Sequence, residues 1–353
     1  SITKRALTVA YTAADRVYDQ TTAVTVTGTG AAKVAGDDLA YTQTASFADK
    51  NAGANKTVSV SNIELTGVDK DNYSLQNTTA TTTATITAKS LTVSYTGTNK
   101  TYDGTTTTTV TGSTTDVISG DTVNISQSAA FASKNAGTAR TINVTGITLT
   151  GAEAGNYALA ANSTTTTADI AQKNLTATYS GQNKVYDGLA TASVTGASTD
   201  IIAGDAVSFT QTAAFDDKNA GTGKTINVSS IALAGGDAAN YALQNTTATT
   251  TANITKKALT VSYSGTDKVY DATTTATVTG SSTDKVGGDT LSYTQTAVFA
   301  DKNVGAGKNI SITGITLDGA DKDNYALQNT TAMTAASIGK ATLNVTGASA
   351  QDK

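Results

Sequence analysis

Apolar and polar residues alternate along most of the chain with a period of two, which is typical of half-buried β-strands. Leu7, Val9 and Tyr11 alternate with polar residues, and the stretches 39–47 and 73–75 show the same alternation. Glycines separate these stretches as turns do, and no segment has the 3.6-residue period of a helix. The pattern predicts six or seven strands in each stretch of about 84 residues.

The inward phase of this alternation slips by one residue between Val60 and Ile63. A slip of one moves every following side chain to the other face of a sheet unless an extra residue absorbs it. The sequence therefore predicts a β-bulge or a change of sheet at Ser61-Asn62.

The whole pattern recurs at intervals of 84 residues, four times and without insertion or deletion. Such a repeat indicates one domain copied in tandem, and no shorter period suggests a solenoid. The repeat signature consists of these columns: Tyr18-Asp19, Tyr102-Asp103, Tyr186-Asp187 and Tyr270-Asp271; Asp37, Asp121, Asp205 and Asp289; Gln43, Gln127, Gln211 and Gln295; Phe47, Phe131, Phe215 and Phe299; Lys50-Asn51, Lys134-Asn135, Lys218-Asn219 and Lys302-Asn303; Tyr73, Tyr157, Tyr241 and Tyr325.

The repeat frame predicts the domain boundaries and the fold class. We expect an all-β tandem array of four small, antiparallel, β-sandwich-like domains joined end to end in an elongated rod. The boundaries expected from the frame are residues 1–4 (end of a preceding repeat), 5–88 (repeat 1), 89–172 (repeat 2), 173–256 (repeat 3), 257–340 (repeat 4) and 341–353 (start of a following repeat).

The junctions between copies contain no flexible linker. In the first junction the inward-facing residues have even numbers up to Ile86 and odd numbers from Leu91 onwards. The change takes place across Ala88 to Ser90, and this segment contains no glycine or proline. A short β-type junction is stiffer than a Gly/Ser tether. The sequence therefore predicts that one strand passes from each core to the next.

The aromatic residues fall in a few repeat columns, which indicates a packed core. All 14 Tyr and 5 Phe occupy the five columns that begin with Tyr11, Tyr18, Tyr41, Phe47 and Tyr73. A row of exposed aromatics for sugar binding is the alternative interpretation. The Gln43 column lies on the inward phase, and because a buried amide needs partners we expect a side-chain to backbone hydrogen bond there.

Composition narrows the functions. The chain has no His, no Cys and no Trp, and its net charge is −4. It therefore lacks the usual neutral-pH base, the thiol nucleophile and the commonest zinc ligands, and it lacks the basic surface that nucleic acid requires. We expect no enzyme, no nucleic-acid binding and no resident cofactor, and no apolar run reaches membrane-spanning length.

The ordered motifs resemble those of a known family. Lys-x-Tyr-Asp-Gly-Thr, as at residues 100–105, is followed by Gly-Asp, by Phe-x-x-Lys-Asn-Ala-Gly and by Asn-Tyr. This order is similar to the YDG-domain repeats of very large haemagglutinin-like, biofilm-associated bacterial adhesins. The resemblance covers essentially the whole chain, and Gln20 and Ala272 depart from it where the motif has Gly. It implies an extracellular, cell-surface protein and no defined ligand.

Three local features have alternative interpretations. The Asp19 and Asp37 columns resemble paired catalytic carboxylates, but aspartate in such turns more simply accepts backbone N–H groups. Asp69, Asp71, Asp321 and Asp323 are candidate calcium ligands, although Gly155 and Ala239 replace one of them in the other copies. The Lys-Asn pair predicts a turn with an exposed lysine, and an isopeptide crosslink to a separate partner is the alternative.

The repeats are therefore predicted to be stalk or spacer units of a secreted bacterial surface adhesin, which project a distal binding region for adhesion or biofilm formation. The expected partners are the neighbouring repeats of the same chain. The alternative is that the repeats themselves bind matrix polysaccharide or pair homotypically between cells.

Overall fold

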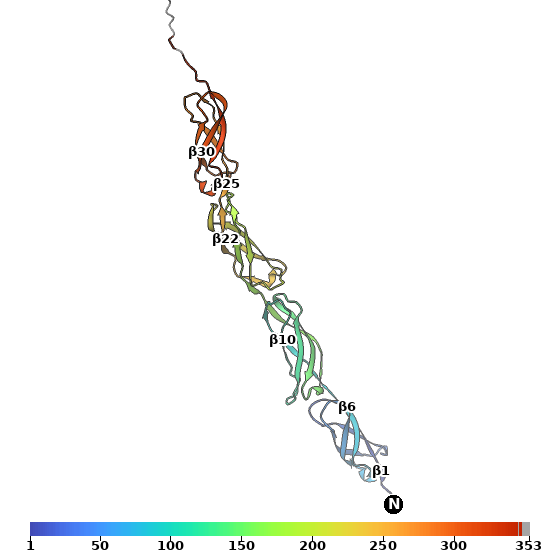
Figure 1. Cartoon of the computed structure of the whole chain (residues 1–353). Coiled ribbons are helices and arrows are strands. Elements are labelled where there is room, and N and C mark those ends of the chain that lie inside the picture. Colours follow the sequence, from blue (N-terminus) through green and yellow to red (C-terminus); the bar gives the residue numbers. More distant parts are fainter. Residues whose placement is uncertain (345, 348–353) are drawn as a thin grey trace, which may run out of the picture. The chain divides into compact units, whose positions relative to one another are not determined.

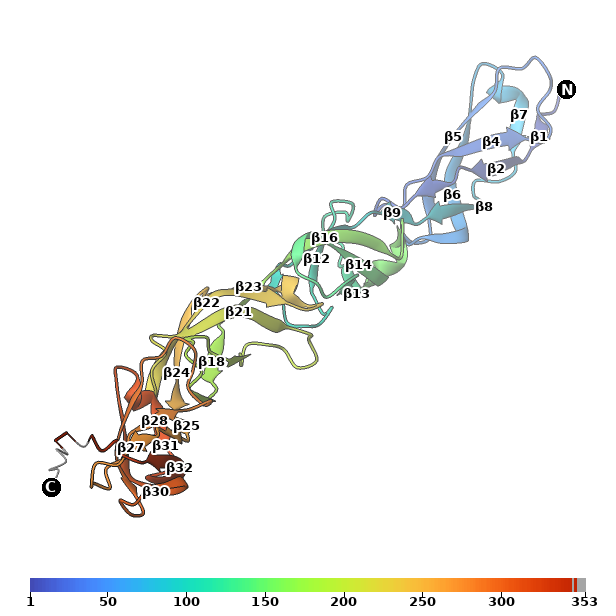
Figure 2. The same ribbon diagram turned by 90° about the horizontal axis from the view of Figure 1, so that it is seen from above.

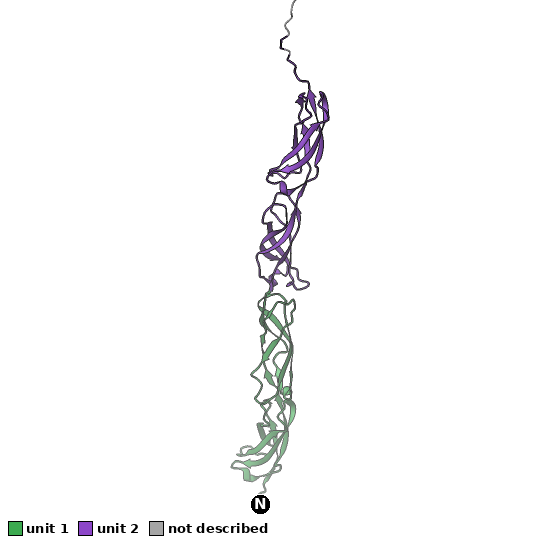
Figure 3. Cartoon of the chain, turned by 60° about the vertical axis from the view of Figure 1, so that its left-hand side comes forward, with its two compact units in different colours: residues 1–173 green, residues 174–353 purple. Residues whose placement is uncertain are grey.

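The computed structural model describes residues 1–344 and 346–347 of the chain. The chain divides into two compact units, Ser1–Lys173 and Asn174–Lys353 (Figure 3). These are the first and the second unit, and each contains two of the predicted repeats.

The strands of the first unit follow the same order in both of its repeats (Figure 1). Repeat 1 contains β1 (Arg5–Leu7), β2 (Val9–Ala13), β3 (Arg16–Val17), β4 (Val26–Gly30), β5 (Ala40–Phe47), β6 (Gly53–Thr66), the 3-10 turn η1 (Lys70–Asn72), β7 (Tyr73–Leu75) and β8 (Ala80–Thr87). Repeat 2 contains β9 (Lys89–Leu91), β10 (Ser94–Gly97), β11 (Lys100–Thr101), β12 (Val110–Ser113), β13 (Asn124–Phe131), β14 (Gly137–Thr150), η2 (Ala154–Asn156), β15 (Tyr157–Leu159) and β16 (Thr164–Ala171).

The second unit repeats this order. Repeat 3 contains β17 (Lys173–Leu175), β18 (Thr178–Gly181), β19 (Lys184–Val185), β20 (Val194–Ala197), β21 (Ser208–Phe215), β22 (Gly221–Ala234), η3 (Ala238–Asn240), β23 (Tyr241–Leu243) and β24 (Ala248–Thr255). Repeat 4 contains β25 (Lys257–Leu259), β26 (Ser262–Gly265), β27 (Lys268–Val269), β28 (Val278–Ser281), β29 (Ser292–Phe299), β30 (Gly305–Asp318), η4 (Lys322–Asn324), β31 (Tyr325–Leu327) and β32 (Thr331–Gly339).

Each repeat folds into a curled sheet, so the predicted all-β tandem array is confirmed. In repeat 1 the four-stranded sheet has the order β3-β8-β6-β5, the hairpin β2-β4 packs beside it, and β1 pairs with β7 (Figure 2). The other three repeats have the corresponding orders. Among the described residues there is no α-helix, and accordingly no helix that could cross a membrane.

Two short pairings in repeat 1 differ from the purely antiparallel arrangement that we expected. β1 pairs with β7 in parallel, and so does β3 with β8, whereas the long pairings β5–β6 and β6–β8 are antiparallel. A period-two pattern reports which face of a strand is buried but not the direction of its neighbour. The direction of two- and three-residue strands was therefore not accessible from the sequence.

The alternating apolar residues form the core as predicted. Leu7, Val9, Tyr11, Val58 and Val60 are all buried, and their neighbours in the chain are mostly exposed. The alternation places one face of each strand inside because successive side chains of a strand point to opposite faces.

The predicted bulge is present. Thr42 pairs with Glu64 and Thr44 pairs with Ser61, so that two residues of β6 lie opposite one residue of β5. The extra residue, Asn62, has a φ of 54°, in the left-handed region that asparagine tolerates better than most residues. The bulge lets Val60 and Ile63 both point into the core despite their odd spacing.

The junction between repeats 1 and 2 also agrees with the phase change. β8 ends at Thr87 and β9 begins at Lys89, so a single residue separates the last strand of one repeat from the first strand of the next. Ile86 and Leu91 on either side are both fully buried.

The two segments that we expected to be the end of a preceding repeat and the start of a following one differ from the repeats. Residues 1–4 and 341–344 contain no strand. The remainder of the predicted start of a following repeat, at 345 and 348–353, lies outside the described residues.

Candidate functional site

The Asp of the Tyr-Asp motif closes a local turn in all four repeats. Its Oδ1 accepts the backbone N–H two residues later, at 2.9 Å in every copy: Asp19 from Thr21, Asp103 from Thr105, Asp187 from Leu189 and Asp271 from Thr273. The cation three residues earlier, such as Lys100 with its Nζ 2.8 Å from Asp103, pairs with the same carboxylate. This column therefore acts as the turn-forming aspartate that the sequence suggested.

The Tyr of the same motif forms a hydrogen bond with the following repeat. In the first unit the Tyr18 hydroxyl lies 3.2 Å from Oδ1 of Asp121, which belongs to the Gly-Asp motif of repeat 2. The Tyr157 hydroxyl of repeat 2 donates to the other oxygen of Asp121 at 2.6 Å, and Gln20 of repeat 1 donates to Oδ1 at 2.8 Å. One carboxylate thus accepts hydrogen bonds from two repeats.

The second unit contains the same arrangement around Asp289. The Tyr186 hydroxyl of repeat 3 lies 3.1 and 2.9 Å from its two oxygens, and the Tyr325 hydroxyl of repeat 4 donates at 2.6 Å. Here the Lys218 ammonium, 3.2 Å from Oδ1, contributes an additional hydrogen bond from repeat 3. The side chain of Asp289 is only 1% exposed, so these donors replace the water that a carboxylate otherwise requires.

The two tyrosines that share each carboxylate also pack against each other. The rings of Tyr18 and Tyr157 are 5.7 Å apart at 74°, and those of Tyr186 and Tyr325 are 5.6 Å apart at the same angle. Edge-to-face pairs of this kind contribute beyond the area they bury.

The Lys-Asn and Asn-Tyr motifs meet in the same place. Oδ1 of Asn156 accepts the backbone N–H of Ala52 at 2.8 Å, and its Nδ2 donates to Oδ1 of Asn51 at 3.4 Å. Asn324 makes the same two contacts with Ala220 and Asn219 in the second unit, at 2.8 and 3.3 Å. The short turns η2 and η4 place these asparagines immediately before the tyrosine of the joint.

The site is therefore a joint between consecutive repeats. Its tail half belongs to the earlier repeat and contains the Tyr of Tyr-Asp and the Lys-Asn-Ala loop. Its head half belongs to the later repeat and contains the Asp of Gly-Asp and the Asn-Tyr pair. Apolar packing continues through it, because Leu91 and Tyr157 of repeat 2 belong to the same buried cluster as the core of repeat 1.

The electrostatics of the joint keep its carboxylates ionised. Burial pushes the pKa of Asp121 upward, but hydrogen bonds from Tyr157, Gln20 and Tyr18 outweigh it and hold the pKa below its usual value. Asp289 behaves in the same way, with Tyr325, Tyr186 and Lys218 as its donors. An ionised carboxylate accepts stronger hydrogen bonds than a neutral one.

The lysine of the Lys-Asn pair corrects the expectation of an exposed turn residue in repeat 3. Lys218 lies 3.2 Å from Asp289 and 3.7 Å from Asp321, and its side chain is half-buried. Hydrogen bonds with Tyr186 and with Asp289 raise the pKa of Lys218 to about 12. A protonated amine facing ionised carboxylates is an ion pair and has no free electron pair with which to form an isopeptide bond.

Titration at high pH provides one test of the joint. Burial, and after it the hydrogen bond to Asp121, raises the pKa of Tyr18 to about 12. A folded-state pKa above the unfolded value of about 10 means that this stabilisation is complete below about pH 10 and is lost as pH rises towards about 12. We expect the difference in tyrosinate absorbance between the native chain and Tyr18→Phe to titrate near pH 12. A difference curve centred near pH 10 would contradict the contact.

The turn after the Tyr-Asp motif contains a strained residue in repeat 4. Ala272 has a φ of 66°, where repeat 3 has Gly188 with a φ of 81°. A Cβ added at Gly188 would lie 2.7 Å from Cγ1 of Val286 in the next repeat, whereas the side chain of Ala272 is exposed. The joint therefore needs glycine in repeat 3 for space as well as for conformation.

Ala272→Gly and Gly188→Ala should change the stability of the second unit in opposite directions. Ala272→Gly is expected to stabilise repeat 4 by about 0.5–1 kcal/mol because it relieves left-handed strain, and Gly188→Ala is expected to destabilise the second unit by more than that. Thermal unfolding of the two variants measures both. Equal and small effects of Gly188→Ala and Ala272→Gly would show that Val286 does not restrict the turn.

The candidate calcium ligands have another role in the structure. Oδ2 of Asp69 accepts the backbone N–H of Asp38 at 2.8 Å, and Oδ2 of Asp321 accepts that of Thr290 at 2.8 Å. Glu153 fills the same place with Thr122, at 2.9 Å. Asp71 and Asp323 lie two residues further on, in η1 and η4, and both are exposed. Within the described residues no three His, Cys, Asp or Glu side chains gather as a metal site would require.

The Gln43 column corrects a further expectation. Among the described residues, a side-chain to backbone hydrogen bond of this column occurs only at Gln127, whose Nε2 donates to the Val110 carbonyl at 3.5 Å. In repeats 1 and 4 a tyrosine hydroxyl donates to the glutamine instead, Tyr11 to Gln43 and Tyr263 to Gln295, at 3.5 and 3.3 Å. In repeat 3 the buried Oε1 of Gln211 has no hydrogen-bond partner among the described residues.

The phenylalanine column lies in the core as predicted, under the cation that precedes the Tyr-Asp motif. Arg16, Lys100, Lys184 and Lys268 lie 5.5–5.9 Å from the ring centroids of Phe47, Phe131, Phe215 and Phe299.

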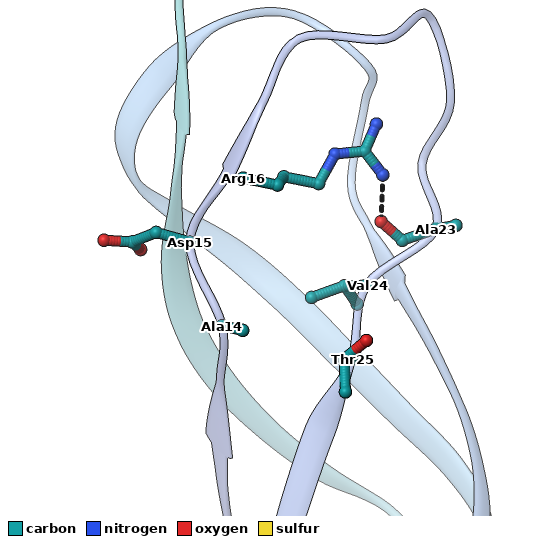
Figure 4. A pocket seen from close by; sticks show the side chains of 6 residues that line it. All are labelled: Ala14, Asp15, Arg16, Ala23, Val24 and Thr25. Carbon is teal, nitrogen blue, oxygen red and sulfur yellow. Dashed lines mark hydrogen bonds between the residues drawn. The ribbon is translucent and has the colours of Figure 1, made fainter.

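A shallow hollow of about 280 Å³ lies beside Arg16, and its polar groups do not converge on one point as those of the joint do. Figure 4 shows the Arg16 guanidinium donating to the Ala23 carbonyl, while the Asp15 side chain points away. Asp15 instead accepts the backbone N–H of Thr85 at 2.6 Å. Among the described residues the buried Nε of Arg16 has no hydrogen-bond partner, so the hollow presents this one unused donor.

Comparison with protein families matches four consecutive segments of the chain. Residues 3–83, 87–167, 171–250 and 255–333 each match the family model described as the YDG domain. No curated protein sequence matches the chain.

Proposed function

Since the chain belongs to the YDG domain family through four tandem copies, we propose that its repeats are spacer units in the stalk of a secreted bacterial surface adhesin. Tandem repeats of this kind support a structural role. In this proposal the repeats lie outside the cell and hold a distal binding region away from its surface. We propose no catalytic role, because the chain lacks both His and Cys.

The observation that supports the proposal best is the joint. A spacer transmits position only if consecutive repeats are fixed to each other, and a flexible tether would not do this. Asp121 and Asp289 each receive hydrogen bonds from two consecutive repeats. The signature residues of the repeat are thus used to attach the next repeat, and no ligand is needed to explain them.

Small-angle scattering of the chain, extrapolated to zero concentration, tests the spacer role. A globule of this length would have a radius of gyration of about 20 Å. We expect a clearly larger value, and a compact value near that of the globule would contradict the proposal.

Binding to matrix polysaccharide is measured on the same sample. A spacer is expected to show no binding, whereas binding repeats would gain avidity with copy number. Such a gain would favour the alternative in which the repeats themselves hold the matrix.

A further inference from the structure

The first strand of each repeat is attached to the penultimate strand of the same repeat. In repeat 1, β1 pairs with β7 in parallel, and the backbone N–H of Gln76 continues the pairing by donating to the Leu7 carbonyl at 2.9 Å. The corresponding bonds of the other repeats, at 2.8–3.0 Å, join Ala160 to Leu91, Gln244 to Leu175 and Gln328 to Leu259. The point where the chain enters a repeat is thus bound to a segment near its end.

An asparagine side chain extends this first ladder by one more residue. Oδ1 of Asn77 accepts the backbone N–H of Val9 at 2.9 Å, and its Nδ2 donates to the Val9 carbonyl at 3.0 Å. The amide therefore bonds both backbone groups of one residue, as a neighbouring strand would. The same two contacts, at 2.8–3.0 Å, join Asn245 to Ala177 and Asn329 to Val261. Repeat 2 has Ala161 at this position.

A second parallel ladder joins β3 to β8, the last strand of the repeat. Arg16 pairs with Ile86, and the backbone N–H of Tyr18 donates to the Thr87 carbonyl at 2.9 Å. At the other end of this ladder, Oδ1 of the residue before β3 accepts a backbone N–H of the last strand. These contacts, at 2.6–2.8 Å, are Asp15 with Thr85, Asn99 with Asp169, Asn183 with Asn253 and Asp267 with Ser337.

The direction of these strands decides how a pull on the chain loads them. The chain enters repeat 1 through β1 and leaves it through β8, and the two strands lie towards opposite ends of the repeat (Figure 2). A pull on both ends draws β1 backwards along its own axis, while it draws β7 and β8 forwards. Because β1 is parallel to β7, and β3 to β8, the strands of each pair are forced to slide past each other.

Sliding loads all the hydrogen bonds of a ladder at the same time. Hydrogen bonds between strands lie across the strand axis, so none of them can open before the others when the strands move along it. In an antiparallel hairpin pulled at its two open ends, by contrast, the bonds break one pair after another. Two parallel ladders at the entry and exit strands therefore resist a pull more strongly than their small number of bonds suggests.

We propose that each repeat withstands tension along the chain, and that these two ladders with their side-chain extensions are the elements that resist it. We call them the clamp. The proposal goes beyond the spacer role, because holding a distance does not by itself require resistance to force. It also gives a role to two polar columns that the joint does not use, those of Asp15 and Asn77.

Single-molecule pulling on the full chain from its two ends tests the clamp. The unfolding of one repeat of 84 residues lengthens the chain by roughly 300 Å less the folded length, which identifies each event. The double variant Asn77→Ala and Asn329→Ala removes the amide from repeats 1 and 4, and Ala161 shows that a repeat folds with alanine there. We expect two of the four repeats to unfold roughly tenfold faster or more at constant force, because forced unfolding follows the unfolding rate.

Gln76→Ala with Gln328→Ala is the matched control. These glutamines directly precede the two asparagines and are exposed, and repeat 2 has Ala160 at their position. Their side chains donate at 2.8 Å to carbonyls only two residues earlier, those of Ser74 and Ala326. The control therefore removes a hydrogen bond that does not cross the ladder, and we expect it to unfold at the native rate.

The direction of the pull separates a clamp from general stability. The chain has no Cys, so Ala35→Cys and Val68→Cys, both at exposed positions, provide handles at the open ends of the antiparallel β5–β6 hairpin. We expect this hairpin to open at a clearly lower force than any repeat needs when the chain is pulled from its ends at the same loading rate. Adding Asn77→Ala should leave this lower force unchanged.

Two results would overturn the proposal. One is an equal force in the two directions of pulling. The other is an unfolding rate of the asparagine variant that does not exceed that of the glutamine control. Both results concern force and not dimensions, so they are separate from a failure of the spacer role in scattering. Melting curves confirm that each variant is folded before it is pulled.

Discussion

Replacing Tyr186 by alanine is expected to destabilise the second unit by about 3–5 kcal/mol, the usual range for truncating a buried aromatic side chain. Tyr186 is 2% exposed, packs edge-to-face on Tyr325 and donates to Asp289. The substitution removes all three interactions and leaves a cavity between repeats 3 and 4. Denaturant unfolding of the full chain, followed by hydrogen exchange in the second unit, measures the loss.

Tyr270→Ala is the matched control for this effect. Tyr270 occupies the same position in repeat 4 but is 36% exposed. We expect Tyr270→Ala to lower the free energy of unfolding by no more than about half as much as Tyr186→Ala does, because less buried apolar surface is lost. Equal costs at the two positions would mean that Tyr186 stabilises only its own repeat.

Replacing Asp289 by alanine is expected to cost about 3 kcal/mol, because an unpaired buried donor typically costs about 1–3 kcal/mol. The substitution leaves the hydroxyls of Tyr186 and Tyr325 and the ammonium of Lys218 without their common acceptor. The same unfolding and exchange measurements detect it. Because the pKa of Asp289 is below its ordinary value, acid should mimic the substitution, with stability present above about pH 4 and lost as pH falls further.

Asp37→Ala is the corresponding control in repeat 1. Asp37 accepts only the Tyr73 hydroxyl among the described residues. Its removal is expected to cost about 1 kcal/mol, as a single hydrogen bond does. A cost similar to that of Asp289→Ala would show that the preceding repeat contributes nothing to this carboxylate.

Much of the fold within a repeat follows from the sequence. The period-two alternation identified the buried faces of β2 and β6, and the phase slip before Ile63 located the bulge that the pairing of Thr42 with Glu64 confirms. Both depend on local geometry that a strand imposes on its own side chains. The phenylalanine column lies in the core for the same reason.

The joint was not predicted, although most of its residues belong to the repeated motifs. In a strict repeat, a tyrosine column and an aspartate column are compatible with contacts inside one copy and with contacts between copies. The structure contains both, because Asp121 accepts Tyr157 from its own repeat and Tyr18 from the preceding one. Only the folded chain distinguishes them.

One clue in the sequence does point to the joint. Aspartate, asparagine and tyrosine recur at fixed positions in turns, where a core requirement would select apolar side chains. Polar residues that are fixed in every copy indicate satisfied hydrogen bonds, and Asn156 and Asn324 are buried for this purpose. The pairs that they form lie 104–105 residues apart, one repeat length plus a short offset.

The joint gives several columns of the repeat signature a common physical role. The Tyr of Tyr-Asp, the Asp of Gly-Asp, and the Lys-Asn and Asn-Tyr pairs all contribute to it, while the Asp of Tyr-Asp shapes the turn that presents the tyrosine. The additional donor to this carboxylate differs between the units: Gln20 donates to Asp121 in the first unit, and Lys218 donates to Asp289 in the second. The contact between the repeats is retained although this additional donor differs.

A double-mutant cycle across the joint tests this account most directly. Tyr186→Phe, Asp289→Ala and the double variant are compared through the free energy of opening of the second unit. We predict a coupling free energy of at least about 1 kcal/mol. Each single substitution already removes the hydrogen bond between Tyr186 and the charged Asp289, so the double variant loses it only once. The parallel cycle with Tyr270→Phe and Asp289→Ala should show none. A coupling between Tyr186 and Asp289 that is indistinguishable from zero would contradict the claim that the signature residues hold consecutive repeats together.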